Sequence, residues 1–327
     1  MQDILSQTIA GKDLSMSEAC RAMDIIMAGE ASDAQIGAFL TALRIKGETS
    51  EEVAGFAATM RKHALSIKCQ SRAIIDTCGT GGDCKGTFNI STTVAFVLAG
   101  AGVKVAKHGN RSVSSACGSA DVLTALGVKV DLPPAAVAQA IDEIGIGFLY
   151  APVFHQAMKY AAGPRKELGF RTVFNLLGPL TNPAGTDCQL VGVYDEALTE
   201  KVADALVRLG VKRALVVHSR DGMHEISTAA PTRAAEVRDG MVKSYLIEPE
   251  ELGLPLAAAD SYLGGNPGQN AQLIRNILQG EPGPKRDIVL INAAGGLLVA
   301  DKVATLRDGL VMAAASIDSG AALAKLE

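Results

Sequence analysis

This sequence of 327 residues lacks the marks of several protein classes. Its longest apolar stretch, residues 94–103, is interrupted by glycines and is far shorter than the roughly 20 residues that cross a membrane as a helix. The first residues lack the basic-then-apolar order of a secretory signal, so we expect a cytoplasmic protein. Basic residues are not in excess. The net charge of −4 argues against a nucleic-acid binder, whose affinity rests on Lys and Arg.

Cysteine pairs of the metal-binding or redox type are also missing. The six cysteines form no C-x-x-C pair and match no zinc-finger spacing. In a chain without an export signal, the expectation is reduced thiols. Cys78 and Cys84 flank a glycine-rich loop but have no histidine ligands nearby in the sequence, so we interpret them as small packing residues.

The common phosphate fingerprints are absent too, although the sequence contains a loop of that kind. The segment 76–92 reads DTCGTGGDCKGTFNIST and follows a short apolar run. A Walker loop needs Gly directly before Lys, but Lys85 follows Cys84. A dinucleotide fingerprint that starts at Gly79 finds Gly81, and then Cys84 in place of its last glycine.

The glycine loop nevertheless has the properties of an anion site. Gly79, Gly81 and Gly82 allow positive φ angles and let backbone N–H groups approach a ligand. Residues 89–92 then open a helix, whose free N–H groups and dipole favour an anion. Asp83 fits such a site only if a cation lies between, which suggests a phosphate bound with Mg²⁺. A tight turn with an ordinary helix cap is the alternative.

The chain divides into a helical part and an α/β part. Residues 1–66 contain three helix starts at Ser15, Ser32 and Thr49, each with Glu or Gln three residues later, as in a capping box. From about residue 72, apolar strands alternate with helices, which predicts an α/β sheet covered by helices. The expected strands are 73–76, 103–106, 189–193, 214–218 and 288–292, and the expected helices include 92–101, 135–144 and 199–209.

Three further segments have the side chains of a binding site. Residues 107–115, KHGNRSVSS, follow an expected strand and concentrate donors for an anion. Arg165 has the planar fork that suits a carboxylate, although a surface arginine is about as plausible there. Residues 221–227, DGMHEIS, follow another strand, where a carboxylate is able to hold Mg²⁺ but His224 is a poor ligand for so hard a cation.

Taken together, these segments resemble the anthranilate phosphoribosyltransferases of tryptophan biosynthesis. The resemblance implies a small all-helical N-terminal domain and a larger α/β domain with a central, mostly parallel sheet of the nucleoside phosphorylase type. We place these domains at 1–66 and 72–327, with helices from about 150–180 joining the small one. It also implies a homodimer formed through the helical domain. The matching stretches are GTGGD at 79–83, TFNIST at 87–92, KHGNRSVSS at 107–115, GSADVL at 118–123, RKELG at 165–169, NLLGPLTNP at 175–183 and KRDIVLINAA at 285–294.

The resemblance further implies which residues hold the substrates. Ser91 and Glu225 would ligate Mg²⁺, and Gly79, Asn110 and Arg165 would contact anthranilate, with Arg165 near its carboxylate. The neutral amine of anthranilate is able to attack as it stands, so no catalytic base is assigned, and His108 is a positioning candidate only. Phosphoribosyl pyrophosphate would be lined by Gly79, Gly82, Asp83, Thr87, Asn89, Ile90, Ser91, Thr92, Lys107, His108, Gly109, Asn110, Arg111, Ser112, Val113, Ser114, Ser115 and Ser119.

Two positions depart from the family pattern. His224 stands where the family usually has Asp before Glu, a pair that serves a second Mg²⁺. Our hypothesis is weaker binding of the second metal, with Asp221 or water as a substitute. Gln156 stands where Pro often follows the histidine.

Two other functions compete with this interpretation. A pyrimidine nucleoside phosphorylase shares the fold family, but its glycine loop is spelled differently and residues 107–110, KHGN, do not suit it. A non-enzymatic relative that binds nucleic acid through a basic cleft is disfavoured by the acidic net charge and the intact GTGGD. Phosphorolysis of thymidine and a gel shift with single-stranded DNA are the respective tests.

Overall fold

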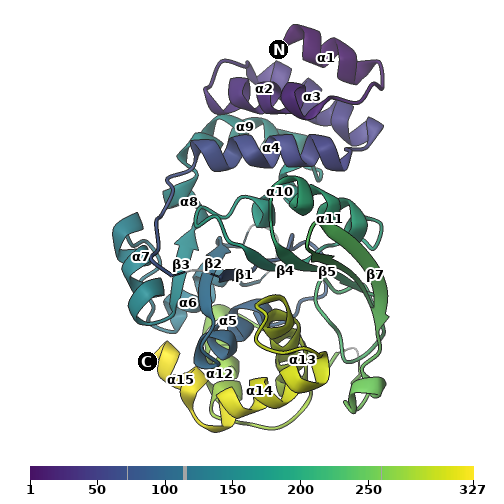
Figure 1. Cartoon of the computed structure of the whole chain (residues 1–327). Helices are drawn as coiled ribbons and strands as arrows, with labels where there is room; N and C mark the ends of the chain where they lie inside the picture. The colour runs from purple at the N-terminus through teal and green to yellow at the C-terminus, as the bar shows by residue number, and fades with distance from the viewer. Residues whose placement is uncertain (72, 113–115, 259) are drawn as a thin grey trace.

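The computed structural model describes residues 1–71, 73–112, 116–258 and 260–327 (Figure 1). A helical unit at the N-terminus sits above a twisted sheet, and further helices lie beneath that sheet. Within the described residues, no helix has the length and apolar character needed to span a membrane. The helical unit begins with α1 (Gln2–Ile9), α2 (Met16–Met27), α3 (Asp33–Lys46) and α4 (Ser50–His63).

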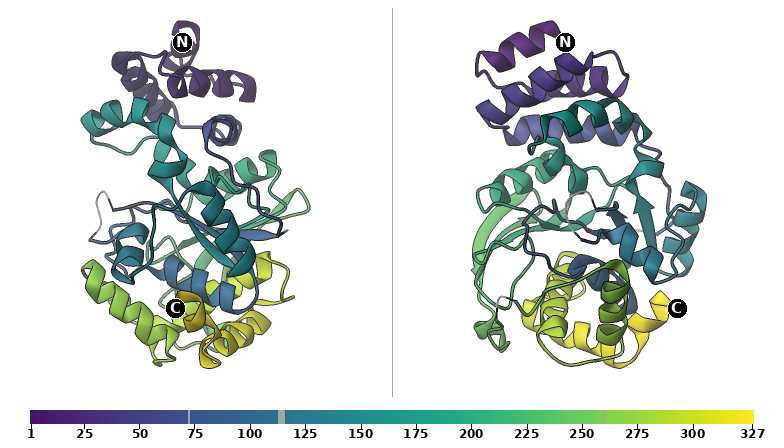
Figure 2. Two further views of the ribbon diagram at one scale, coloured as in Figure 1. Left: turned by 90° about the vertical axis from the view of Figure 1, so that its left-hand side faces the viewer. Right: turned by 180° about the vertical axis from the view of Figure 1, so that it is seen from behind.

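The expected helix starts of this unit are confirmed. The side chains of Ser15, Ser32 and Thr49 each accept a hydrogen bond from the backbone N–H three residues on. The Glu or Gln side chain at that position in turn accepts the backbone N–H of the cap residue. These reciprocal bonds satisfy N–H groups that a helix end leaves open. The unit also contacts helices from much later in the chain, as Figure 2 shows. They are α9 (Lys159–Leu168), α10 (Phe174–Leu180) and α11 (Leu198–Arg208). The short helix α8 (Ala151–Phe154) and the 3₁₀ turn Gln156–Met158 precede α9.

A sheet of seven strands forms the second layer, in the order β3-β2-β1-β4-β5-β6-β7. The first five strands pair in parallel, and the last two are antiparallel, so the expected mostly parallel sheet is confirmed. Four expected strands correspond to β1 (Ile74–Thr77), β2 (Lys104–Gly109), β4 (Cys188–Gly192) and β5 (Arg213–Ser219). Three strands were not predicted: β3 (Ile146–Tyr150), β6 (Thr232–Arg238) and β7 (Met241–Ile247).

The prediction of a strand at residues 288–292 is wrong. These residues lie inside α13 (Pro284–Val299), which packs against α5, α14 and the strands β4 and β5. A helix enclosed on most sides shows a continuous apolar run, which cannot be told from a buried strand by periodicity alone. The Asn292 side chain donates to the carbonyl of Ile288 one turn earlier and to that of Ile226, and it accepts the N–H of Ile226.

Helices cover both faces of the sheet. The expected helices are found as α5 (Ile90–Gly100), α7 (Pro134–Glu143) and α11 (Leu198–Arg208). One apolar core lies between the sheet and α5, α12, α13 and α14, and a second joins the other face to α10, α11 and the helical unit. The remaining helices are α6 (Ser119–Ala125), the 3₁₀ turn Glu250–Leu252, α12 (Pro267–Leu278), α14 (Leu306–Asp318) and α15 (Ala321–Leu326).

The strand order places a ligand-binding edge between β1 and β4. The chain builds outward from β1 through β2 to β3, and then returns to lay β4 on the opposite side of β1. The connections after β1 and β4 therefore leave the sheet in opposite directions, and ligands of open α/β sheets bind at such a switch point, beyond the carboxyl ends of the strands. The glycine loop follows β1 directly.

Candidate active site

The glycine loop is held against the end of β4 and the connection that follows β5. The N–H of Thr80 donates to the carbonyl of Gly192 at 2.8 Å. A Cβ atom on Gly79 would lie 2.5 Å from Cδ2 of His224, and one on Gly192 would lie 1.6 Å from the His224 carbonyl oxygen. Only glycine fits at both positions. Of the three glycines expected to allow positive φ angles, Gly81 and Gly82 adopt them, with values of +64° and +79°, and Gly79 does not.

The start of α5 lies at the same edge and has no side-chain cap. Asn89 occupies the cap position, but its amide donates to the carbonyl of Cys117 and its oxygen accepts from Asn270. The first turn therefore keeps the character of an anion-binding helix start. Thr87 forms an isolated bridge with Leu263. The hydroxyl of Thr92 is buried and has no hydrogen-bond partner among the described residues.

Lys107 is the buried cation beneath this loop. Its ammonium group donates to the carbonyl of Thr77 at 2.6 Å and to the Ser91 hydroxyl at 3.3 Å, and the residue is only 3% exposed. Burial raises the pKa of the Asp76 carboxyl to about 6, and the charge of Lys107 limits that rise. Lys107 thus faces inward, where it orients Ser91 and compensates neighbouring carboxylates.

Glu225 supplies a second buried carboxylate beside Ser91. Burial raises its pKa to about 7, although the charges of His224 and Lys107 and the N–H of Ser91 favour the ionised form. A further cation close to this carboxylate would stabilise its ionised form. The Glu225 carboxylate and the Ser91 hydroxyl offer oxygen atoms, which are the ligands that Mg²⁺ prefers. The residues present therefore fit a magnesium ion.

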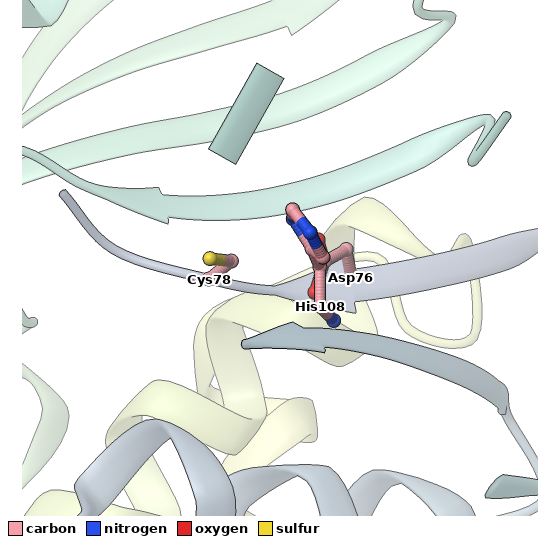
Figure 3. Close-up of side chains that lie close together, drawn as sticks. All are labelled: Asp76, Cys78 and His108. Carbon is pink, nitrogen blue, oxygen red and sulfur yellow. The ribbon is translucent and has the colours of Figure 1, made fainter. Parts of the chain in front are cut away.

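Asp76, Cys78 and His108 lie close together, as Figure 3 shows, but their bonds describe a structural network. The Asp76 carboxylate accepts the N–H of His108 at 3.1 Å and the amide of Asn182 at 2.8 Å. Burial raises the pKa of the Cys78 thiol to about 12, so the thiol is protonated in this environment. The network joins β1 to β2 and to the segment after α10, which agrees with Cys78 as a packing residue.

His108 is neutral in this environment. Burial and the neighbouring His155 lower its pKa to about 3, and its Nδ1 lies 3.1 Å from the carbonyl oxygen of Gly178. The ring of His155 lies 5.1 Å away between centroids, and burial lowers its pKa to about 4. The Nε2 atoms of both rings are buried without a partner among the described residues.

The segment that begins at Lys107 is less open to anions than its composition predicts. The Arg111 guanidinium is paired with the Asp121 carboxylate at 2.8 Å, and the same carboxylate accepts the N–H groups of Ser112 and Gly118 at 3.0 Å. The Ser119 hydroxyl donates to the Asn110 carbonyl. Val113, Ser114 and Ser115 lie outside the described residues.

Asp83 receives its cation from the protein itself. Nδ1 of His224 contacts Oδ2 of Asp83, and the His224 N–H donates to the same oxygen at 3.3 Å. Burial alone would raise the pKa of Asp83, but the bond and charge of His224 outweigh it and lower that pKa to about 2. Asp221 accepts the Ser227 hydroxyl at 2.6 Å and the Met223 N–H at 3.1 Å, so its carboxylate is already occupied within its own loop.

Two arginines lie on α9 and on the connection from α9 to α10. Arg165 lies on α9, with its guanidinium carbon 5.0 Å from the centroid of the Phe174 ring, and burial lowers its pKa. Among the described residues it forms no ion pair with a carboxylate. Arg171 was not predicted as a site residue. It donates to the Gly82 carbonyl and stacks over the Tyr194 ring at 4.4 Å, and no sequence motif marks it.

Comparison with known proteins shows the family to which the chain belongs. Residues 71–323 match the profile "Glycosyl transferase family, a/b domain", and residues 2–64 match "Glycosyl transferase family, helical bundle domain". Anthranilate phosphoribosyltransferase of Moorella thermoacetica is 59% identical over 323 residues, which cover 99% of this chain and 95% of that protein. The Symbiobacterium thermophilum protein of the same name is 56% identical and covers 100% of this chain and 96% of its own. The chain belongs to the anthranilate phosphoribosyltransferase family.

Solved structures of this family have the same fold. The anthranilate phosphoribosyltransferase of Thermus thermophilus superposes with a TM-score of 0.95 at 45% identity, covering 99% of this chain and 97% of that one. The Saccharomyces cerevisiae enzyme, in complex with PRPP (phosphoribosyl pyrophosphate) and Mg, superposes with a TM-score of 0.90 at 28% identity, covering 99% and 96%. The predicted fold class and enzyme class are confirmed.

As an anthranilate phosphoribosyltransferase, the chain transfers the phosphoribosyl group of PRPP to anthranilate in tryptophan biosynthesis. The structure brings many of the predicted residues to one sheet edge, after β1, β2, β4 and β5. The family match sets aside the phosphorylase and nucleic-acid alternatives. The predicted residues that meet at this edge through the contacts above are Gly79, Gly82, Asp83, Ser91, Lys107, His224 and Glu225.

Proposed function

We propose that this sheet edge holds PRPP and one Mg²⁺. The observation that carries the proposal is the buried Glu225 carboxylate beside Ser91 and Lys107, directly beneath the glycine loop. Ser91 and Glu225 would hold the ion, which would stabilise charge on the departing pyrophosphate. The proposed PRPP contacts remain Gly79, Gly82, Asp83, Thr87, Asn89, Ile90, Ser91, Thr92, Lys107, His108, Gly109, Asn110, Arg111, Ser112 and Ser119, together with Val113, Ser114 and Ser115.

Each part of this cradle has a separate task. The N–H groups of the glycine loop and of the α5 start are aimed at an anion and need little reorganisation when it binds. Lys107 contributes from below, because its ammonium group fixes the Ser91 hydroxyl and offsets the charge of Glu225. Orientation of the two substrates supplies much of the remaining rate enhancement.

Anthranilate is proposed to bind at Gly79, Asn110 and Arg165. A half-buried guanidinium without a carboxylate partner among the described residues suits the carboxylate of this substrate. The amine nitrogen then forms a bond to C1 of the ribose as the bond from C1 to the pyrophosphate oxygen breaks, and the amine afterwards loses a proton to solvent. No strong base is needed. Neutral His108 donates from Nδ1 to Gly178 and so positions α10.

The PRPP site is tested by amide hydrogen exchange. PRPP with Mg²⁺ is expected to slow exchange in residues 79–92, because bound anions occupy these N–H groups. Slower exchange is also expected in 107–112. Mg²⁺ alone is the control for metal-induced ordering. Protection in other parts of the chain with none in these two segments would contradict the proposed site.

His224 leads to a prediction about the number of metal ions. Because His224 already pairs with Asp83, we expect this enzyme to need only the ion at Ser91 and Glu225. His224→Asp replaces the cation by a carboxylate and creates a cluster with Asp83 and Glu225, so a second, Mg²⁺-dependent phase is expected in the rate and in PRPP calorimetry. An unchanged Mg²⁺ dependence would show that His224 does not control metal stoichiometry.

We also propose a homodimer that forms through the helical unit of residues 1–66. A hollow of about 360 Å³ lies between α1 and α3, and it is flanked by Ile9 and Ile45, which are 66% and 82% exposed. Small side chains on the exposed face of α3 let a second helix approach closely, and one patch that meets its own copy forms a closed two-fold dimer. The lining residues are Thr8, Ile9, Gly11, Gly37, Ala38, Thr41, Ala42, Ile45 and Lys46.

Ile45→Glu tests this dimer. A buried, unpaired charge at the centre of the interface is expected to shift the protein from dimer to monomer in light scattering. Ile144→Glu is the matched control, since Ile144 is also exposed, at 50%, but follows α7 at a distance from the helical unit. A dimer that survives Ile45→Glu would place the interface elsewhere.

A further inference from the structure

We infer that Arg171 is a positioning residue of the glycine loop, which it holds in the substrate-receptive conformation by its bond to the Gly82 carbonyl. The inference rests on the proposed function, because it assumes that this loop receives PRPP. Arg171 belongs to the connection between α9 and α10, whereas Gly82 lies in the loop after β1, 89 residues earlier in the chain.

The Arg171 guanidinium contacts the glycine loop and an aromatic ring at the same time. Its Nη2 donates to the carbonyl oxygen of Gly82, and its guanidinium lies over the Tyr194 ring at 4.4 Å. A Cβ atom on Gly82 would lie 3.3 Å from Nη2, so the backbone and the guanidinium are in close contact. Tyr194 follows β4 and is half-buried, which gives the guanidinium a flat and stationary platform.

A hold on this carbonyl determines how the loop presents its donors. The peptide unit is planar, so fixing the Gly82 carbonyl also fixes the direction of the Asp83 N–H on the opposite side of that plane. Gly81 and Gly82 have positive φ angles and many accessible conformations, and ordering them only when substrate arrives would weaken binding.

The two residues at this bend are held from two different parts of the chain. Arg171 binds the Gly82 carbonyl, and His224 binds the Asp83 side chain. Thr80 is tied to Gly192 in addition. The loop is therefore anchored to the α9–α10 segment, to the connection after β5 and to the end of β4. Of these three anchors, Arg171 comes from the segment that also carries the proposed anthranilate residue Arg165.

Arg171→Ala is expected to accelerate amide exchange of residues 79–86 in the substrate-free enzyme. Loss of one charge-assisted hydrogen bond is expected to raise the KM for PRPP by about tenfold, with little change in kcat or in the KM for anthranilate. Arg307→Ala is the matched control, because Arg307 is also exposed and also donates to a backbone carbonyl, that of Glu251, far from the loop. It is expected to leave exchange and both KM values unchanged.

Conservative variants separate positioning from general stability. Arg171→Lys keeps the charge but loses the planar group that stacks on Tyr194, so it is expected to restore the PRPP KM only in part. Tyr194→Leu removes the platform and is expected to reproduce the faster exchange of Arg171→Ala, whereas Tyr194→Phe retains it.

Two results would overturn the inference. If Arg171→Ala raises the PRPP KM while exchange in the substrate-free enzyme stays unchanged, Arg171 contacts the substrate and does not position the loop. If neither quantity changes, the bond from Arg171 to the Gly82 carbonyl does not position the loop. Failure of the proposed function looks different, since PRPP would then leave residues 79–92 unprotected in the unaltered enzyme, whatever Arg171 does.

Discussion

Glu225→Gln is expected to reduce kcat/KM by at least about a hundredfold, because a metal ion stabilises developing charge by several kcal/mol. The amide has nearly the shape of the carboxylate but carries no charge for Mg²⁺. It also leaves the charge of Lys107 less well compensated in a buried position. The rate is measured with saturating substrates across a Mg²⁺ titration.

Folding and metal binding are checked separately for this variant. A melting temperature near that of the unaltered enzyme would show that the loss is not unfolding, and calorimetry of PRPP should show that Mg²⁺ no longer strengthens binding. Glu281→Gln changes an exposed carboxylate outside the site and is expected to have no effect. An unchanged Mg²⁺ dependence in Glu225→Gln would remove Glu225 from the proposed metal site.

Arg165→Ala is expected to raise the KM for anthranilate by about 10- to 150-fold, which corresponds to the roughly 1.5–3 kcal/mol of a hydrogen bond to a charged group. The PRPP KM should change far less, since the pyrophosphate is held at the glycine loop. Steady-state kinetics with each substrate varied in turn measures both values.

Arg165 also packs on Phe174, so the variant needs a control for lost packing. Arg165→Lys keeps the positive charge but not the bidentate fork, and it is expected to recover part of the anthranilate affinity. Arg165→Met keeps much of the apolar stem and should behave like Arg165→Ala. Equal increases in both KM values would contradict a role in anthranilate binding.

The sequence predicted the elements that have strong local signals. Capping boxes at Ser15, Ser32 and Thr49 marked three helix starts because their hydrogen bonds join neighbours in the chain. The prediction of a strand at residues 288–292 was wrong because α13 is enclosed, and burial on most sides removes the periodicity that identifies a helix. The antiparallel strands β6 and β7 were missed, and β7 lies at the sheet edge with six of its seven residues partly or fully exposed.

Part of the candidate site was also accessible from the sequence. The glycine loop, the α5 start and the segment after β2 follow one another along the chain, and strand order then brings them to one edge. The orientation of Lys107 toward Thr77 and Ser91, and the pairing of Arg111 with Asp121, depend on tertiary contacts. Asp83 was expected to need a cation, and only the fold shows that His224 provides one.

Arg171 shows the limit of motif-based analysis most clearly. It follows Arg165 closely in the sequence, yet its partner Gly82 is 89 residues away. No spacing rule connects the two. Their contact depends on tertiary packing, because α9 packs on α2 and α3 and α10 packs on α4, and the connection between them reaches the glycine loop.

The central claim is tested most directly by following anthranilate fluorescence. The purified enzyme is mixed with anthranilate, PRPP and Mg²⁺, with and without EDTA, and fluorescence is recorded as the product forms. The account predicts a decrease that needs all three components and stops when EDTA is added. No decrease from protein shown to be folded, or a decrease that is indifferent to EDTA, would contradict magnesium-dependent phosphoribosyl transfer at this site.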